Sequence, residues 1–414
     1  MKASALFLAV AAVACAEKVS TDKLISMTQQ RVPELEGALR DTLGDANIEK
    51  GTAAAGEMGE FVWAVRAGSQ PLLQIGQEPP VAAWKAGGLW VYQGRLKTGT
   101  AYKYSWIVDG KIFGGDSNLA AFGRDSYKQS DVPEGKQVGP LVLESKIYPG
   151  MKANVWYYVP AQWDGSTPLP VQIWGDGQFY TVPRPSAYRV QEALDNLTAQ
   201  KRIPLMVNVF IQPGTGVARN QRSIEYDTVD DTYARYLLEE VLPEINKSVK
   251  LREDSYSRAM VGESSGGICA FNAAFLKPDQ FSRVLSWIGS FSALQTSPAH
   301  PAGGAEYPIM VRREPKRNIR VWLQDGAEDQ ENPRAGSWPL ANIHMANSLK
   351  LKGYDYHFSF GPGTHSQRQG SAELPESLAW LWRGYDPAKT SEEFAPDPAE
   401  KEKPVWRVMQ LNRN

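Results

Sequence analysis

A serine flanked by glycines is the first candidate for chemistry. Residues 261–267 contain the pattern Gly-x-Ser-x-Gly, in which Ser264 is the serine. A strand-like apolar run precedes the pattern, and a helical run containing Ala and Phe follows it. Because a sharp strand-to-helix turn that exposes a strained serine needs small neighbours, this context predicts that Ser264 is a nucleophile. The alternative is a chance match in a loop rich in Ser and Gly; Ser265 fits the spacing less well.

A nucleophilic serine needs a general base, and the chain contains 4 histidines. His365 follows the last expected strand, in the glycine-rich turn 361–366 just before the final expected helix. His357 falls within an apparent strand, His344 within a helical stretch and His300 in a Pro-rich loop. The chain order Ser, acid, His of α/β-hydrolases puts the base where His365 stands. We therefore predict His365 as the base, against the alternative of a surface histidine in a loop.

The acid that orients this histidine is expected in the loop 324–331. The loop carries the carboxylates Asp325, Glu328, Asp329 and Glu331. We predict that Asp329 is the acid, with Glu328 the next candidate and Asp325 a brace of the turn. Such an acid fixes the imidazole tautomer and stabilises the imidazolium while His365 holds the serine proton. The remaining carboxylates would form a solvated acidic loop.

Backbone N–H groups are the expected ligands of the oxyanion. The N–H of Ser265 follows the nucleophile at the start of the helix. The second donor is expected after an early strand, where glycines in the loop 175–180 let the backbone approach a substrate oxygen. Gln178 and Gly177 are the candidates, and a simple structural turn is the alternative.

Strands and helices alternate after Pro140. We expect strands at 154–159, 170–174, 205–211, 257–261, 284–288, 319–323 and 354–360, and helices at 233–245, 268–275, 341–351 and 374–382. Continuous apolar strands separated by helices are typical of a mostly parallel sheet covered on both faces. The expected fold is therefore an α/β-hydrolase with a mostly parallel central sheet.

Short alternating segments between residues 59 and 140 predict a small β-sandwich ahead of that sheet. Asp109-Gly110 is its strongest hairpin turn. Residues 22–43 predict a weak helix interrupted at Pro33. The expected division is a signal peptide at 1–16, a helical extension at 17–57, an immunoglobulin-like β-sandwich at 58–142, the α/β-hydrolase domain at 143–386 and a C-terminal tail at 387–414.

The first residues resemble a signal peptide, with Lys2, an apolar run at 3–14 and small residues after it. Cleavage after Ala16 predicts a protein exported to the periplasm or secreted. The alternative is an imperfect lipoprotein box that leaves Cys15 lipidated. Cleavage would leave Cys269 as the one cysteine, so no disulfide is expected. No further apolar run reaches the ~20 residues of a transmembrane helix.

Length and charge bound the class of protein. The 414 residues, of which 42% are hydrophobic, are enough for a large core and two domains. Lys and Arg number 45 against 46 Asp and Glu, and no basic block stands out, which argues against nucleic acid as a partner.

Several motifs together resemble the enterochelin-esterase-like family of esterases, which also includes S-formylglutathione hydrolase, feruloyl and acetylxylan esterases, and mycolyltransferases. The resemblance covers residues 144–385 and lies in the segments 174–180, 222–227, 233–243, 262–267, 289–291, 324–326, 336–341 and 363–365. The segment 59–140 is similar to the immunoglobulin-like domain that enterochelin esterases place before the hydrolase.

The resemblance implies hydrolysis of a carboxylic ester through an acyl-serine intermediate, with no metal and no cofactor. It supports the triad and oxyanion candidates named above, and it implies a small-molecule or carbohydrate ester, such as a siderophore-type ester, as substrate. Arg219 and Arg222, with Tyr180, are candidates to bind an acidic or catecholate group. For Arg222 we favour the alternative, a structural pair with Glu225 or Asp227.

Two other functions fit the same pattern. An acyltransferase of this fold would move an acyl group to a sugar. A catalytically silent carbohydrate-binding protein would capture glycan on its β-sandwich, through tryptophans such as Trp84 and Trp90. The presence of Ser264, an acidic loop and His365 favours an enzyme.

Overall fold

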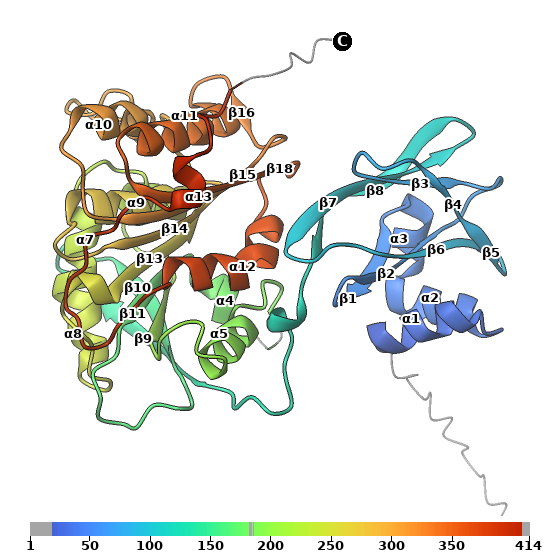
Figure 1. Cartoon of the computed structure of the whole chain (residues 1–414), viewed down its shortest axis with the longest axis horizontal. Coiled ribbons are helices and arrows are strands. Elements are labelled where there is room, and N and C mark those ends of the chain that lie inside the picture. The colour runs from blue at the N-terminus through green and yellow to red at the C-terminus, as the bar shows by residue number, and fades with distance from the viewer. Residues whose placement is uncertain (1–18, 182–183, 185, 408–414) are drawn as a thin grey trace, which may run out of the picture. The chain divides into compact units, whose positions relative to one another are not determined.

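The computed structural model describes residues 19–181, 184 and 186–407 (Figure 1). The expected signal peptide and Cys15 lie outside these residues. The chain forms two compact units, of which the first contains the residues up to Leu96 together with Ser105–Gly115. The second contains Lys97–Tyr104 and the chain from Asp116 onward. Within the described part, no helix is long and apolar enough to cross a membrane.

Helices cover one face of a sheet in the first unit. The helices are α1 (Thr21–Gln30), α2 (Leu35–Leu43) and α3 (Asp45–Lys50), so Pro33 separates α1 from α2 as expected. The sheet has the order β1 (Ala53–Glu57), β2 (Glu60–Val65), β6 (Leu89–Arg95), β5 (Trp84–Ala86). Val62 and Ala64 of β2 pack with the helices, whereas the alternate residues Phe61, Trp63 and Val65 are buried on the other face. Both faces of this sheet are therefore covered.

A second four-stranded sheet has the order β4 (Val81–Ala82), β3 (Leu72–Ile75), β7 (Thr100–Val108), β8 (Lys111–Ala121). Asp109 and Gly110 join β7 to β8, both with positive φ (48° and 75°), so the expected hairpin turn is present. Two sheets of short strands fit a sandwich, and its immunoglobulin-like character stays a prediction. The β7–β8 hairpin is divided between the units, because Lys97–Tyr104 and the chain from Asp116 belong to the second one.

The second unit is built on an eight-stranded sheet. Its order is β18 (Asp355–Gly361), β15 (Arg320–Gly326), β14 (Arg283–Trp287), β13 (Arg258–Glu263), β11 (Val171–Gly175), β12 (Val207–Ile211), β10 (Lys152–Val159), β9 (Lys136–Glu144). The six strands from β18 to β12 are parallel, and β10 and β9 run antiparallel to their neighbours. The sheet is thus mixed but mostly parallel, and every strand expected after Pro140 is present within a few residues of its expected bounds.

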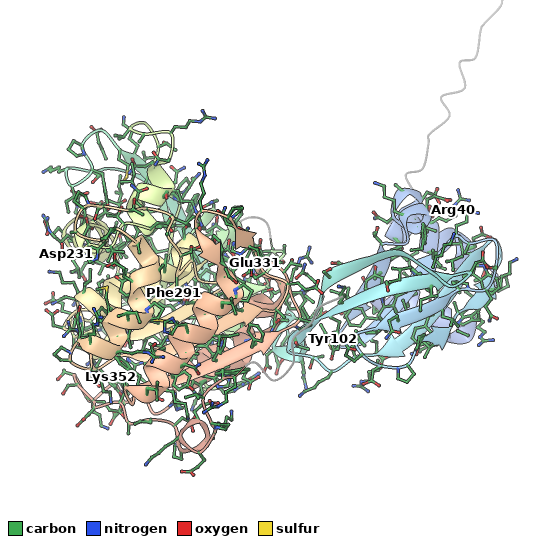
Figure 2. The ribbon with its side chains drawn as sticks, turned by 90° about the horizontal axis from the view of Figure 1, so that it is seen from above. Arg40, Tyr102, Asp231, Phe291, Glu331 and Lys352 are labelled. Atoms are coloured by element: carbon green, nitrogen blue, oxygen red, sulfur yellow. The ribbon has the colours of Figure 1, made fainter. Side chains whose placement is uncertain are left out.

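Helices lie on both faces of this sheet (Figure 1). One layer contains α7 (Thr232–Tyr236), a π-helical turn (Leu237–Val241), α8 (Leu242–Asn246), α9 (Ser265–Leu276), α10 (Tyr307–Arg313) and α11 (Trp338–Leu351). Phe291 is buried in this layer, and Lys352 follows the end of α11 (Figure 2). The other layer contains α5 (Val190–Ala199) and α12 (Arg368–Leu381). The strands serve both layers because successive side chains point to opposite faces: Ile173 of β11 packs in the first layer and Trp174 in the second.

Short elements complete the second unit. They are the helices α4 (Gln178–Thr181), α6 (Gln221–Tyr226) and α13 (Pro398–Lys401), the strands β16 (Glu331–Asn332) and β17 (Gly336–Ser337), and the 3-10 turns Arg124–Ser126, Ser255–Ser257 and Gly303–Glu306.

The boundaries of the expected domains differ from the observed ones. The central sheet begins with β9 at Lys136, ahead of the boundary expected between 142 and 143. The residues 136–142 of β9, expected in the β-sandwich, thus belong to the central sheet. The sequence there is polar because β9 is an edge strand with many exposed side chains. The C-terminal segment also differs from a plain surface tail: Phe394 is 2% exposed, beneath the guanidinium groups of Arg283 and Arg320.

A buried ion-pair network ties β15 and β18 to the end of α12. Asp355 is fully buried and accepts from Arg320 Nε and Arg383 Nη2, both at 2.6 Å.

We expect Asp355→Ala to lower the free energy of unfolding by about 3–5 kcal/mol, because it leaves the buried Arg320 charge without its partner. Urea unfolding measures this loss. Glu239→Gln removes the exposed Arg235–Glu239 pair and should change stability by less than about 1 kcal/mol; equal losses in both variants would contradict the argument.

Candidate active site

Ser264 occupies the tight turn between β13 and α9. Its backbone has φ 54° and ψ −120°, a conformation that a non-glycine residue rarely adopts. The turn can close this tightly because Gly262 has no side chain: a Cβ atom there would lie 2.1 Å from the carbonyl oxygen of Gly266. The Ser264 N–H donates to Trp287 O at 2.9 Å, and Ser290 N–H donates to Ser264 O at 3.0 Å. The end of β14 and the loop that follows it therefore hold the strained residue in place.

His365 lies within hydrogen-bond distance of this serine. Its Nε2 is 2.8 Å from Ser264 Oγ, and its Nδ1 is 2.6 Å from Asp329 Oδ1. Because a carboxylate only accepts, Nδ1 carries the proton, and the Nε2 of the neutral ring accepts from the serine hydroxyl. The His365 side chain is 18% exposed and that of Asp329 is fully buried. The His365 side chain is therefore partly accessible from outside the protein, whereas that of Asp329 is not.

The other carboxylates of the acidic loop have different partners. Glu328 pairs with Lys103 Nζ at 2.6 Å, and Glu331 accepts from the hydroxyl of Ser337. Asp325 accepts from the N–H of Gly326 at 2.8 Å, so it braces the turn. Asp329 is thus the carboxylate of this loop that contacts His365.

Asp325 is buried next to Asp329. Burial, and then the neighbouring carboxylate of Asp329, raise the pKa of Asp325 well above its ordinary value. Burial of the two side chains next to each other thus disfavours a second negative charge in this loop. Asp329 is the one of the two that contacts the imidazole of His365.

The three oxyanion candidates are not equivalent. The N–H of Gly177 already donates to Ile211 O at 2.8 Å, which removes it as a donor in this structure. Gly177 instead allows its backbone to lie close to that of Ile211, because a Cβ atom there would lie 2.3 Å from Ile211 N. Gln178 begins α4 and Ser265 begins α9. The first N–H groups of a helix have no intrahelical acceptor, so these two remain candidate donors.

A family comparison matches most of the second unit. Residues 147–381 match the model of the family described as "Putative esterase". The chain belongs to this family. Among the described residues, this esterase-family chain has no group of three or more His, Cys, Asp or Glu side chains that could hold a metal ion.

Known relatives are distant in sequence. The Iron(III) enterobactin esterase of Dickeya dadantii (strain 3937) is 22% identical over 256 residues, which cover 58% of this chain and 53% of that protein. The chain thus matches about half the length of this relative. Two solved structures share the fold: the enterobactin esterase of Shigella flexneri (TM-score 0.52, 17% identity, 78% of this chain and 93% of that one) and the ferric enterobactin esterase of Salmonella typhimurium (TM-score 0.53, 16% identity, 81% and 97%).

Arg222 is held by a carboxylate that the sequence did not suggest. Its Nε and Nη2 donate to the two oxygens of Asp176 at 2.8 and 2.7 Å, so the expected partners Glu225 and Asp227 were wrong. Asp176 directly follows β11 and is 1% exposed, with φ 54°. Arg219 is exposed. The pairing favours a structural role for Arg222, since a buried carboxylate without a cation lowers the free energy of unfolding.

Tyr180 was wrongly expected near the substrate. Its side chain is completely buried, and its ring packs against Trp174 and Tyr188 at centroid distances of 5.2 and 5.6 Å. It belongs to the core layer beneath α5. The short helix α4, which contains Tyr180, turns the side chain into the core.

Two residues behind Ser264 were missed as site residues, although both lie in segments that carried the family resemblance. Trp338 Nε1 donates to Ser290 Oγ at 3.0 Å, and Ser290 Oγ lies 3.2 Å from Ser264 Oγ. Since the indole can only donate, the proton of Ser290 is free to point to Ser264. The hydrogen bonds then run in one direction, from Trp338 through Ser290 and Ser264 to His365, which directs the Ser264 proton at the base.

Glu263, the residue before the nucleophile, is a buried acid. It is 2% exposed and accepts from Gln367 Nε2 at 2.5 Å. Burial, and then the nearby charge of Asp176, raise the pKa of Glu263 to about 8, and Arg222 lowers it only in part. Glu263 is therefore mostly protonated at neutral pH. Its link to Gln367 fixes the chain two residues after His365.

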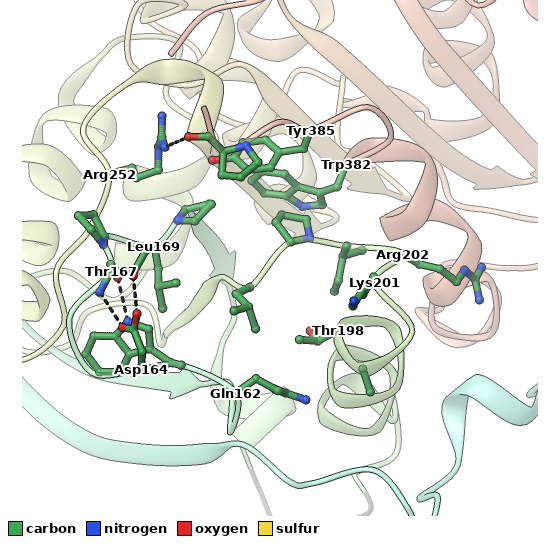
Figure 3. A pocket seen from close by; sticks show the side chains of 18 of the residues that line it. Gln162, Asp164, Thr167, Leu169, Thr198, Lys201, Arg202, Arg252, Trp382 and Tyr385 are labelled. Carbon is green, nitrogen blue, oxygen red and sulfur yellow. Dashed lines mark hydrogen bonds between the residues drawn. The ribbon is translucent and has the colours of Figure 1, made fainter. Parts of the chain in front are cut away.

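A cavity of about 710 Å³ lies elsewhere in the second unit (Figure 3). Trp382, Tyr385 and Leu169 contribute to its lining, and Arg252 at its edge donates to backbone carbonyl groups. Leu169 and Pro170 immediately precede β11, whereas Ser264 follows β13, which is parallel to β11. This cavity is therefore at the opposite end of the strands from the Ser264–His365–Asp329 group.

Arg222→Gln tests whether this arginine is structural. We expect it to lower the free energy of unfolding by about 1–3 kcal/mol, less than for a fully buried pair because the Arg222 side chain is 39% exposed. Chemical denaturation measures the change. The matched variant Arg219→Gln alters an exposed neighbour and should leave stability unchanged. An Arg222→Gln protein of wild-type stability would return Arg222 to the list of substrate-binding candidates.

Glu263 should make stability depend on pH. The unfolded state releases the Glu263 proton near pH 4.5, whereas the folded state keeps it up to about pH 8. Folded protein then holds more protons, so this contribution to stability falls by about 1.4 kcal/mol per pH unit between these values. We expect Glu263→Gln to lose this slope, in urea unfolding from pH 5 to pH 8. Parallel pH profiles of wild type and variant would show that Glu263 ionises normally.

Proposed function

We propose that this chain hydrolyses a carboxylic ester through an acyl-serine intermediate, with Ser264 as nucleophile, His365 as general base and Asp329 as the acid of the triad. One observation carries the proposal: Ser264 Oγ, the two ring nitrogens of His365 and Asp329 Oδ1 are joined by contacts of 2.8 and 2.6 Å. Membership in the esterase family supports the same reaction.

The first half of the reaction forms the acyl-enzyme. Ser264 Oγ attacks the ester carbonyl carbon while its proton passes to His365 Nε2. Asp329 stabilises the imidazolium, and the N–H groups of Ser265 and Gln178 stabilise the negative charge on the former carbonyl oxygen. When the carbonyl reforms, the bond to the alcohol breaks. His365 then gives its proton to the departing alkoxide, so the alcohol leaves neutral.

The second half uses water in place of the alcohol. His365 takes a proton from water, whose oxygen attacks the acyl carbon through the same oxyanion site. The acyl–Ser264 bond breaks, the proton returns to Ser264 Oγ, and a carboxylic acid leaves. An alcohol acceptor in the place of water would give acyl transfer, so the two reactions differ only in the acceptor.

The relatives support a substrate class, and the N-terminal segment supports a compartment. Relatives named as enterobactin esterases support an acyl or aryl ester of a siderophore type, and an ester linked to carbohydrate is the other candidate. The apolar segment after Lys2 supports export to the periplasm or secretion, with a lipid anchor at Cys15 as the variant of that route.

The nucleophile and acid are tested with p-nitrophenyl esters of increasing acyl length and a feruloyl ester. We expect hydrolysis by wild type and a loss of about 10⁶-fold in kcat for Ser264→Ala, which lacks the nucleophile. Asp329→Asn should lower kcat about 10⁴-fold, because it would disfavour the reactive tautomer of His365. Release of p-nitrophenol or ferulate is the measurement.

Glu328→Gln and Glu331→Gln are the matched controls in the same loop. They should keep kcat within a few-fold of wild type, because their carboxylates contact Lys103 and Ser337 rather than His365. Full activity of the Ser264→Ala protein would overturn the proposal. An added alcohol acceptor that yields a new ester would assign acyl transfer to the same residues.

A further inference from the structure

Asn118 of strand β8 contacts the histidine loop, the segment 362–367 that carries His365 between β18 and α12. Asn118 Oδ1 accepts from the backbone N–H of Thr364 at 3.0 Å, and Asn118 Nδ2 donates to Thr364 Oγ1 at 2.7 Å. Both residues belong to the second unit. They are 246 positions apart in the sequence, and Thr364 directly precedes His365.

The two bonds fix both parts of Thr364. One end of the Asn118 amide binds the Thr364 peptide and the other binds its side chain, so neither can rotate independently. The Asn118 backbone is itself held, because its N–H donates to Asp116 Oδ1 at 2.8 Å. Gly363 allows this approach: a Cβ atom there would lie 3.3 Å from Asn118 Oδ1. The peptide that leads into His365 therefore has a fixed orientation.

The rest of the histidine loop has fewer side-chain anchors of this kind. The N–H groups of Ala327 and Glu328 donate to Gly361 O at 2.8 Å and Gly363 O at 3.0 Å, which joins the acid loop to the histidine loop. Lys103 of β7 pairs with Glu328, but both side chains are about half exposed, so this pair contributes little. Asn118 is thus the side chain that holds the chain just before His365, as Gln367 does just after it.

We propose that Asn118 is a positioning residue for the ester hydrolysis described above. By fixing Thr364 it keeps Nε2 of His365 at 2.8 Å from Ser264 Oγ while Nδ1 stays on Asp329. Proton transfer depends steeply on this geometry, since a displacement of about 1 Å can lower a rate about 10²-fold. The inference rests on the proposed function, because it concerns the same triad.

Asn118→Ala removes both bonds and leaves the triad residues unchanged. We expect kcat on the best aryl ester to fall roughly 10–100-fold with little change in KM, since Asn118 acts on the proton transfer and not on substrate binding. The rate at which an aryl fluorophosphonate labels Ser264, followed by intact mass, should fall by a similar factor. Ser117→Ala, one residue earlier on the same strand, should match wild type. Thr364→Val keeps the N–H bond and loses the hydroxyl, so its effect should be smaller.

A double-mutant comparison separates positioning from a general loss of structure. If Asn118 acts through His365, then Asn118→Ala should cause no further loss in the His365→Ala background, in labelling and in residual hydrolysis. A loss of equal size in both backgrounds would overturn the inference, as would wild-type kcat and labelling for Asn118→Ala. Wild-type labelling and hydrolysis by His365→Ala itself would instead overturn the proposed function. Circular dichroism at the assay temperature verifies that each variant is folded.

Discussion

The active site depends on the strained backbone of Ser264. A positive φ at a serine persists only where the surroundings enforce it. Here the close approach of Gly262 to Gly266 and two backbone bonds, to Trp287 and Ser290, enforce it. The parallel sheet makes this possible, because the carboxyl ends of its strands share one edge. Asp176, Ser264, Ser290, Asp329 and His365 each follow a different strand of that edge: β11, β13, β14, β15 and β18.

Buried carboxylates surround the strained turn, and each is accommodated differently. Asp176 pairs with the guanidinium of Arg222, and Asp329 contacts the imidazole of His365. Glu263 and Asp325 have raised pKa values because burial and a neighbouring carboxylate disfavour a second charge. A raised pKa at these two acids reduces repulsion between carboxylates inside the site, because a protonated acid adds no charge. The two other carboxylates each have a side chain that can carry positive charge, Arg222 or His365, within hydrogen-bond distance.

Local patterns made much of this predictable from the sequence. Glycine spacing around Ser264 requires a tight turn, and the alternation of apolar strands and helices predicts the sheet whose strands were found after Pro140. His365 was chosen by its place after the last strand, and Asp329 by its distance from a turn glycine. The edge strand β9 and the inward turn of Tyr180 were not predicted, because both depend on what covers a segment in three dimensions rather than on its own residues.

Contacts between distant segments could not be deduced in the same way. Asp176 with Arg222, Ser290 with Trp338, and Asn118 with Thr364 are pairs far apart in the sequence, and no spacing rule relates their positions. These pairs have a shared consequence. The serine turn is rigid because of its own sequence, whereas the histidine and acid reach it on loops whose orientation is set by residues elsewhere in the chain. Changes in those distant residues can therefore alter catalysis while the recognisable motif stays intact.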